Sequence, residues 1–95
     1  MYRNEALRRA VASLPCQNCG KQGESQAAHS NQQTDGKGLG IKAHDYRIAA
    51  LCQLCHYRLD QGRDMTKVER QAFFDEAHRA TIGALFEAGL LEVKK

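Results

Sequence analysis

The chain has 95 residues, with 14 basic and 11 acidic side chains, a net charge of +3 and four cysteines. This length predicts a single domain over residues 1–95 with a small core, and no apolar run approaches the roughly 18 residues needed to cross a membrane. The first residues open a polar helical pattern and not a secretory leader, so we expect a cytoplasmic, reducing location. The mild positive charge is compatible with a nucleic-acid partner.

The N-terminal half predicts a helix and a strand. Asn4 is a suitable N-cap for a short amphipathic helix over residues 4–14, which Pro15 ends. Residues 25–30 predict a short strand, and the three glycines of residues 31–40 predict a loop.

The C-terminal half predicts a second strand and two more helices. The strand covers residues 46–51, and a short helix follows from residue 53 to about residue 60, before Gly62. Thr66-Lys-Val-Glu is a capping box that begins a long helix over residues 66–88 with a broad apolar face. The order of elements predicts an α+β fold.

The cysteines form two Cys-x-x-Cys pairs, one at Cys16 and Cys19 and the other at Cys52 and Cys55. This spacing predicts one structural zinc ion per chain in a closed tetrahedral site of four thiolates. A redox-active pair and two disulfides are the alternatives. The redox alternative is disfavoured because it requires one such pair at a helix N-terminus after a strand.

Two histidines are candidates for catalysis. His56 directly follows the last cysteine, so a metal-anchored turn would aim its ring. His29 lies at the end of the first predicted strand, and the zinc would bring the His56 segment back towards it. The alternative for His29 is a half-buried ring that is hydrogen-bonded to the backbone.

Three acidic or amide side chains are candidate ligands of a second, catalytic metal. Asp60 is four residues after His56, so on a helix both side chains reach one divalent cation. Asp45, beside His44, is expected either to orient the loop or to touch that metal, and Asn31 is the third candidate. An ordinary surface pair is the alternative for Asp60. His78 is expected to be structural or exposed to solvent.

Basic residues flank these candidates along the chain. Such side chains would hold phosphates and neutralise transition-state charge, although solvated surface charges are the alternative. They are Lys37, Lys42, Arg47, Arg58 and Arg63.

The motifs together resemble the zinc-containing HNH endonucleases, which have a ββα-metal core. The closer resemblance is to the YbcO-type nucleases of lambda-like prophages. It is carried by Ala28-His29-Ser30-Asn31, by Gly36-Lys37-Gly38-x-Gly40-Ile41-Lys42-Ala43 and by Leu51-Cys52-x-Leu54-Cys55-His56.

The resemblance implies a zinc-containing ββα core over residues 16–62. It makes His29 the general base and His56 a ligand of the catalytic cation, which would be Mg²⁺, Mn²⁺ or Ni²⁺. Many HNH enzymes have a metal ligand just before the base, where this chain has Ala28. The expected function is therefore metal-dependent hydrolysis of phosphodiester bonds in DNA.

Two other functions stay open at this stage. One is a zinc-stabilised nucleic-acid-binding module without chemistry, as in a recombination or packaging accessory of a phage. The other is a protein–protein adaptor that dimerises through the long helix, and the oligomeric state of the chain is open as well.

Overall fold

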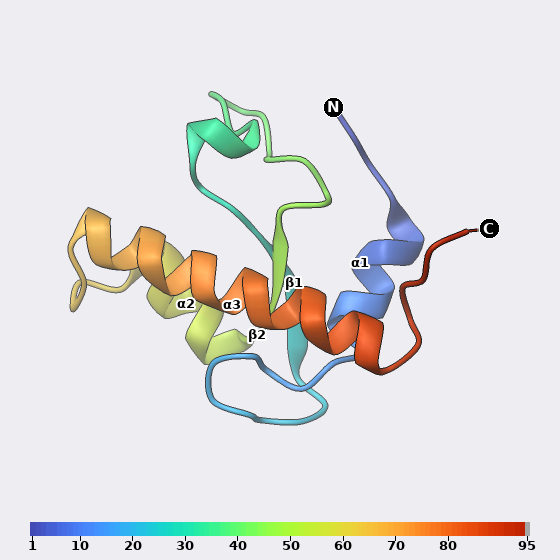
Figure 1. Ribbon diagram of the computed structural model, residues 1–95. Helices are drawn as coiled ribbons and strands as arrows, with labels where there is room; N and C mark the ends of the chain where they lie inside the picture. The colour runs from blue at the N-terminus through green and yellow to red at the C-terminus, as the bar shows by residue number, and fades with distance from the viewer. Residues whose placement is uncertain (95) are drawn as a thin grey trace.

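The computed structural model describes residues 1–94 and has the expected α+β class, with three α-helices and a two-stranded antiparallel sheet (Figure 1). The elements in chain order are α1 (Glu5–Ala12), β1 (Ser25–His29), the 3-10 turn η1 (Gln33–Asp35), β2 (Ile48–Cys52), α2 (Gln53–Gln61) and α3 (Lys67–Glu87). None of the helices in this described part is long and apolar enough to cross a lipid bilayer.

Asn4 caps α1, as predicted. Its backbone is extended, and its side-chain oxygen accepts a hydrogen bond of 3.0 Å from the Leu7 amide. The helix ends at Ala12, two residues before the expected end. Pro15 explains this, because a proline disfavours the helical backbone at the residue before it, Leu14.

The two strands pair in a register that places Ala27 opposite Ala50 and Ala28 opposite Ala49. Successive residues of a strand face opposite sides of the sheet, so the two pairs face different parts of the core. Every residue of β2 is buried, which accounts for its continuous run of small and apolar side chains.

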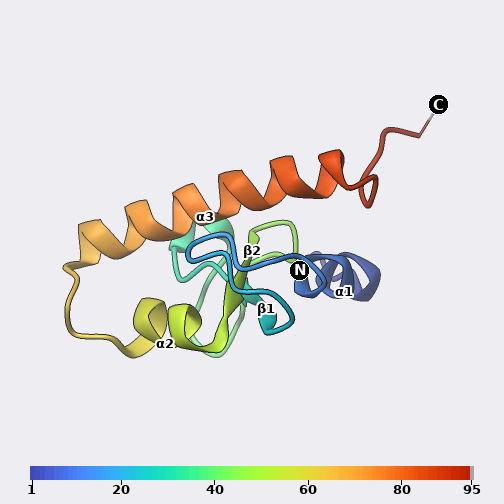
Figure 2. The same ribbon diagram turned by 90° about the horizontal axis from the view of Figure 1, so that it is seen from below.

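The core has two clusters, one on each side of the sheet. One joins Ala28, Ala49 and Leu51 to side chains of α2 and the first half of α3. The other joins Ile48 and Ala50 to side chains of α1 and the second half of α3. Figure 2 shows α3 running over both regions, from α2 at one end to α1 at the other.

The capping box of α3 is confirmed, since the Thr66 hydroxyl accepts from the Glu69 amide (3.1 Å) and the Glu69 carboxylate accepts from the Thr66 amide (2.8 Å). The buried stripe of the helix packs within this chain, and Thr81 accepts a hydrogen bond of 3.0 Å from the Ala50 amide in β2. The apolar face is narrower than we expected at its start, since Val68 is 73% exposed. The buried stripe of α3 is therefore covered by the sheet and by side chains of α1 and α2.

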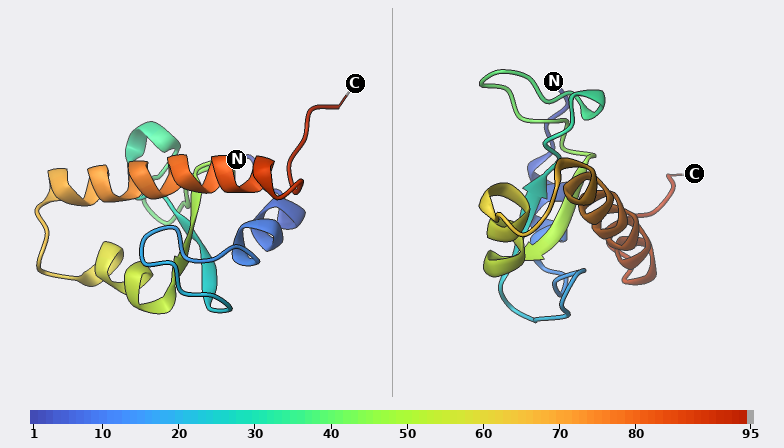
Figure 3. Two further views of the ribbon diagram at one scale, coloured as in Figure 1. Left: turned by 60° about the horizontal axis from the view of Figure 1, so that its bottom comes forward. Right: turned by 90° about the vertical axis from the view of Figure 1, so that its left-hand side faces the viewer.

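The loop between the strands extends beyond the helices and lies near the N-terminus (Figure 3). It includes η1, and it turns at Gly36, whose φ is 92°. A Cβ atom at Gly36 would lie 2.6 Å from the ring of His44, so only glycine fits there. This loop carries Lys42 and Asp45 to the end of β1.

Candidate functional site

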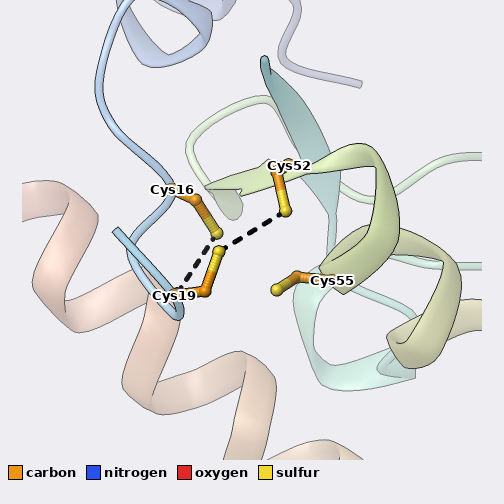
Figure 4. Close-up of side chains that lie close together, drawn as sticks. All are labelled: Cys16, Cys19, Cys52 and Cys55. Atoms are coloured by element: carbon orange, nitrogen blue, oxygen red, sulfur yellow. Dashed lines mark hydrogen bonds between the residues drawn. The ribbon is translucent and has the colours of Figure 1, made fainter. Parts of the chain in front are cut away.

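The four cysteines converge on one point, as Figure 4 shows. Their sulfur atoms all lie within 4.8 Å of one another, and the Cys19 and Cys52 sulfurs are 3.7 Å apart. Two sulfurs on a tetrahedral zinc ion, each about 2.3 Å from the metal, are about 3.8 Å apart. The donor set and the spacing therefore fit a structural metal ion such as zinc.

Local backbone structure explains why the cysteines meet. Gly20 has a φ of 83° and donates to the Cys16 carbonyl (2.9 Å), which closes the first turn. The Gln17 amide donates to the Ala50 carbonyl (2.8 Å) and so fixes this turn against β2. Cys52 ends β2 and Cys55 lies in the first turn of α2, so the second pair is held at a junction of strand and helix.

Without a bound cation, the thiols differ in their pKa values. Burial alone would raise the pKa of Cys16, but backbone amides, that of Cys19 first, lower it to about 6. Burial raises the pKa of Cys55 to about 12, although Asn18 donates to its sulfur (3.2 Å). A bound cation would supply the charge that keeps all four sulfurs ionised at neutral pH.

His29 at the end of β1 contacts a fully buried carboxylate. Its Nε2 atom lies 2.8 Å from Asp45 Oδ1, and Asp45 has no exposed surface. Burial alone would raise the pKa of Asp45, but hydrogen bonds from His29 and the Asn4 amide, together with Arg8, lower it to about 2. Asp45 is therefore ionised at neutral pH, so Nε2 of His29 is the hydrogen-bond donor in this contact.

The N-terminal segment holds Asp45 in place. Its Oδ1 also accepts from Arg3 (3.2 Å), while its Oδ2 accepts from the Asn4 amide (2.7 Å) and from Arg8. With His29, the carboxylate thus has four donors, which fill its acceptor positions. Arg3 and Arg8 were not among the residues predicted from the sequence, since no local pattern connects residues 3 and 8 with residue 45.

His56 and Asp60 form the expected pair on one face of α2. The distance from His56 Nε2 to Asp60 Oδ2 is 3.1 Å, and hydrogen bonding to His56 lowers the pKa of Asp60. The other carboxylate oxygen accepts from Asn31 (2.8 Å), and His56 Nδ1 lies 2.7 Å from Gln26 Oε1. Gln26 is a contact that the sequence did not indicate.

The structure places the two histidines in neighbouring but separate groups of side chains. Gln26 and His29 face opposite sides of β1, since they are three residues apart in a strand. His29 lines a surface cavity of about 310 Å³ to which His56 does not contribute. Asn31 connects the groups, because it is two residues after His29 and contacts Asp60.

The basic residues that we expected to contact phosphates differ in whether a carboxylate pairs with them. Arg47 pairs with Asp35 (3.2 Å), and Arg58 pairs with Asp64 (2.8 Å). Lys42 lines the same cavity as His29. Among residues 1–94, no carboxylate lies within 4 Å of the amino groups of Lys37 and Lys42 or of the guanidinium of Arg63.

The other two histidines have structural contacts. His78 Nδ1 donates to the Ile48 carbonyl (2.8 Å), as expected of a structural residue. His44 Nδ1 accepts from the Tyr2 amide (3.1 Å), and its ring stacks on Tyr46.

No family model, curated protein or solved structure matches this chain. The function is therefore inferred from the residues themselves.

Proposed function

We propose that this protein is a metal-dependent endonuclease that hydrolyses phosphodiester bonds in DNA, built on an HNH-like core with a structural zinc ion. The observation that carries the proposal is the arrangement of two histidine–carboxylate pairs around the end of β1. His29 with Asp45 supplies a base, and His56 with Asp60 supplies ligands for a divalent cation.

The His29–Asp45 contact suits a general base. Because the ionised carboxylate accepts a hydrogen bond from Nε2, Nδ1 is the nitrogen that carries the lone pair when the ring is neutral, and it can then take a proton from water. Imidazole is the side chain whose ordinary pKa lies nearest to neutral pH. Asp45 itself has no free acceptor position, so we assign it to orienting His29 and not to the metal.

The His56–Asp60 contact suits a cation. If His56 Nδ1 donates to Gln26, the Nε2 lone pair faces Asp60, and two lone pairs 3.1 Å apart require a proton or a cation between them. Two ligands at about 2.1 Å and 90° from one ion lie about 3 Å apart, which matches this distance. Asn31 can offer its carbonyl oxygen nearby, since only its amide nitrogen binds Asp60.

When bound, such a cation would stabilise the charge that develops on the phosphate and on the leaving oxygen. His29 would remove the proton from the attacking water. Ala28, at the position where many HNH enzymes have a ligand, contributes none, so water and phosphate oxygens would complete the coordination of the ion.

The experiment is a plasmid cleavage assay on zinc-loaded protein with added Mg²⁺, Mn²⁺ or Ni²⁺. We expect cation-dependent nicking that is lost in His56→Ala while the fold and the zinc content are kept. Tyr57→Ala is the matched control, because Tyr57 is the next residue of α2 and is 58% exposed. Cleavage by His56→Ala at the wild-type rate would show that His56 is not a ligand of the catalytic metal.

A second candidate function is a zinc-stabilised nucleic-acid-binding module without chemistry. It is favoured by one observation, namely that the cavity lined by His29 does not include His56. DNA binding that weakens with salt, without cleavage in the presence of any of the three cations, would establish this function instead.

A further inference from the structure

We propose that the surface cavity lined by Arg3, Arg8, His29, Lys42 and Asp45 is an oxyanion site that holds a phosphate group of the nucleic acid. This inference rests on the proposed function, because it names how that site binds its substrate. The site joins residues from α1 and its preceding segment to the end of β1 and to the loop before β2.

The charges in the cavity favour an anion over a cation. Three basic side chains and one carboxylate line it, so it carries a formal excess of two positive charges when His29 is neutral. The carboxylate is completely buried and its acceptor positions are filled, which leaves the basic groups to face a ligand. A divalent metal would be repelled here, so this cavity is distinct from the pair formed by His56 and Asp60.

The hydrogen bonds divide the basic residues into those that hold the site and those that can bind a ligand. Arg3 donates to the carbonyls of Lys42 and Ala43 and to Asp45, so its guanidinium is committed to the fold. Arg8 reaches Asp45 through one terminal nitrogen, Nη1. Within residues 1–94, its Nε and Nη2 atoms and the Lys42 amino group have no hydrogen-bond partner, and these are the donors for a phosphate.

The position of His29 connects this site to the chemistry. The ring lines the cavity, and its Nε2 atom is bound to Asp45, so its other nitrogen is the one left for a water or a phosphate. A phosphate held by Arg8 and Lys42 would therefore lie beside the proposed base. Preorganised basic groups at this point would also stabilise negative charge that develops during hydrolysis.

The first test is a titration of zinc-loaded protein with inorganic phosphate, followed by NMR of the arginine Nε–H groups and the histidine rings. We expect phosphate to shift the signals of Arg8 and His29 and to leave Arg9 unchanged. Arg9 is the matched control, because it is the next residue of α1 and pairs with Glu5 at 2.9 Å. Phosphate that shifts neither Arg8 nor His29 would overturn the site.

Variants test the named donors. Arg8→Gln should weaken phosphate binding on the order of tenfold, as expected for loss of a charge-assisted hydrogen bond, and Arg9→Gln should leave it unchanged. Because Arg8 also contacts Asp45, the variant that disturbs the fold least is Lys42→Gln, whose side chain is exposed. Phosphate affinity equal to wild type in Lys42→Gln and Arg8→Gln would contradict the assignment.

A short DNA duplex distinguishes a nucleic-acid phosphate from free phosphate. Loss of one phosphate contact should reduce the slope of log K against log salt by about 0.9 in Lys42→Gln. An unchanged slope, with phosphate binding still lost, would show that the cavity serves a free oxyanion and overturn its role in nucleic-acid binding. Phosphate and duplex binding by a protein that never cleaves would support the cavity and overturn only the endonuclease.

Discussion

His29 Nε2 lies 2.8 Å from Asp45 Oδ1, and the same carboxylate accepts a hydrogen bond of 2.7 Å from the Asn4 amide through its other oxygen. The segment that begins α1 therefore determines where a ring at the end of β1 is held. This contact links the N-terminal helix α1 to the proposed chemistry.

Asp45→Asn should lower the free energy of unfolding at neutral pH. It should also make that free energy depend less on pH between about pH 4 and pH 2. The folded pKa of Asp45, about 2, lies below the ordinary value of 3.8. Its contribution of about 2 kcal/mol is therefore complete above pH 3.8 and is lost as the pH falls towards 2. Denaturant unfolding of wild type and variant between pH 7 and pH 2 measures the difference.

Asp64→Asn is the control for this prediction, because Asp64 is exposed and pairs with Arg58 on the surface. Surface pairs contribute little, so its unfolding curve should follow wild type at every pH. If the free energy of unfolding of Asp45→Asn fell as steeply with decreasing pH as that of wild type, this result would contradict the claim that Asp45 is ionised in the folded protein.

Cys19→Ser should abolish stoichiometric zinc binding and leave the domain largely unfolded. A structural zinc ion contributes about 10–16 kcal/mol of apparent binding free energy in small domains, which exceeds the few kcal/mol that a small core leaves. Metal analysis and circular dichroism of protein purified under reducing conditions measure both effects.

Asn18→Ala should weaken zinc binding without abolishing it. Asn18 donates to the Cys55 sulfur (3.2 Å) without being one of the four thiol donors. The Asn18→Ala variant should keep one zinc ion per chain but bind zinc about 10–100-fold more weakly, as is found when other groups that orient metal ligands are removed. A chain with two disulfides and no zinc, isolated from a reducing cytoplasm, would contradict the zinc site.

The elements with strong local signals could be predicted from the sequence. The N-cap at Asn4 and the capping box at Thr66 each act within a few residues, and each has the expected geometry. The cysteine spacing likewise predicted that the four sulfurs would meet, because few arrangements satisfy two Cys-x-x-Cys pairs.

The parts of the site that could not be predicted depend on contacts between distant residues. Arg3 and Arg8 contact Asp45 although about forty residues separate them from it in the sequence, and no periodic pattern predicts these contacts. The residues that neighbour Arg47 and Arg58 in the sequence do not distinguish them from Lys42. In the folded protein, however, each of the two arginines pairs with a carboxylate.

Gln26→Ala should weaken divalent cation binding at the proposed catalytic centre without affecting zinc. Gln26 fixes the orientation of the His56 ring through Nδ1 (2.7 Å), and removal of such a group costs about 10–100-fold in metal affinity. Titration of zinc-loaded protein with Mn²⁺ gives the dissociation constant. Gln53→Ala, at the exposed start of α2, is the control and should bind Mn²⁺ as wild type does. Equal affinities in all three proteins would exclude an orienting role for Gln26.

The most direct test of the endonuclease proposal is cleavage of a defined DNA duplex by zinc-loaded wild type and by His29→Ala, with Mn²⁺ and under single-turnover conditions. A positioned general base contributes about 10²–10⁴-fold, so we predict cleavage by wild type, a loss of this size in His29→Ala, and partial recovery when free imidazole is added. Equal rates for the two proteins, or no cleavage by wild type with Mg²⁺, Mn²⁺ or Ni²⁺, would contradict the account.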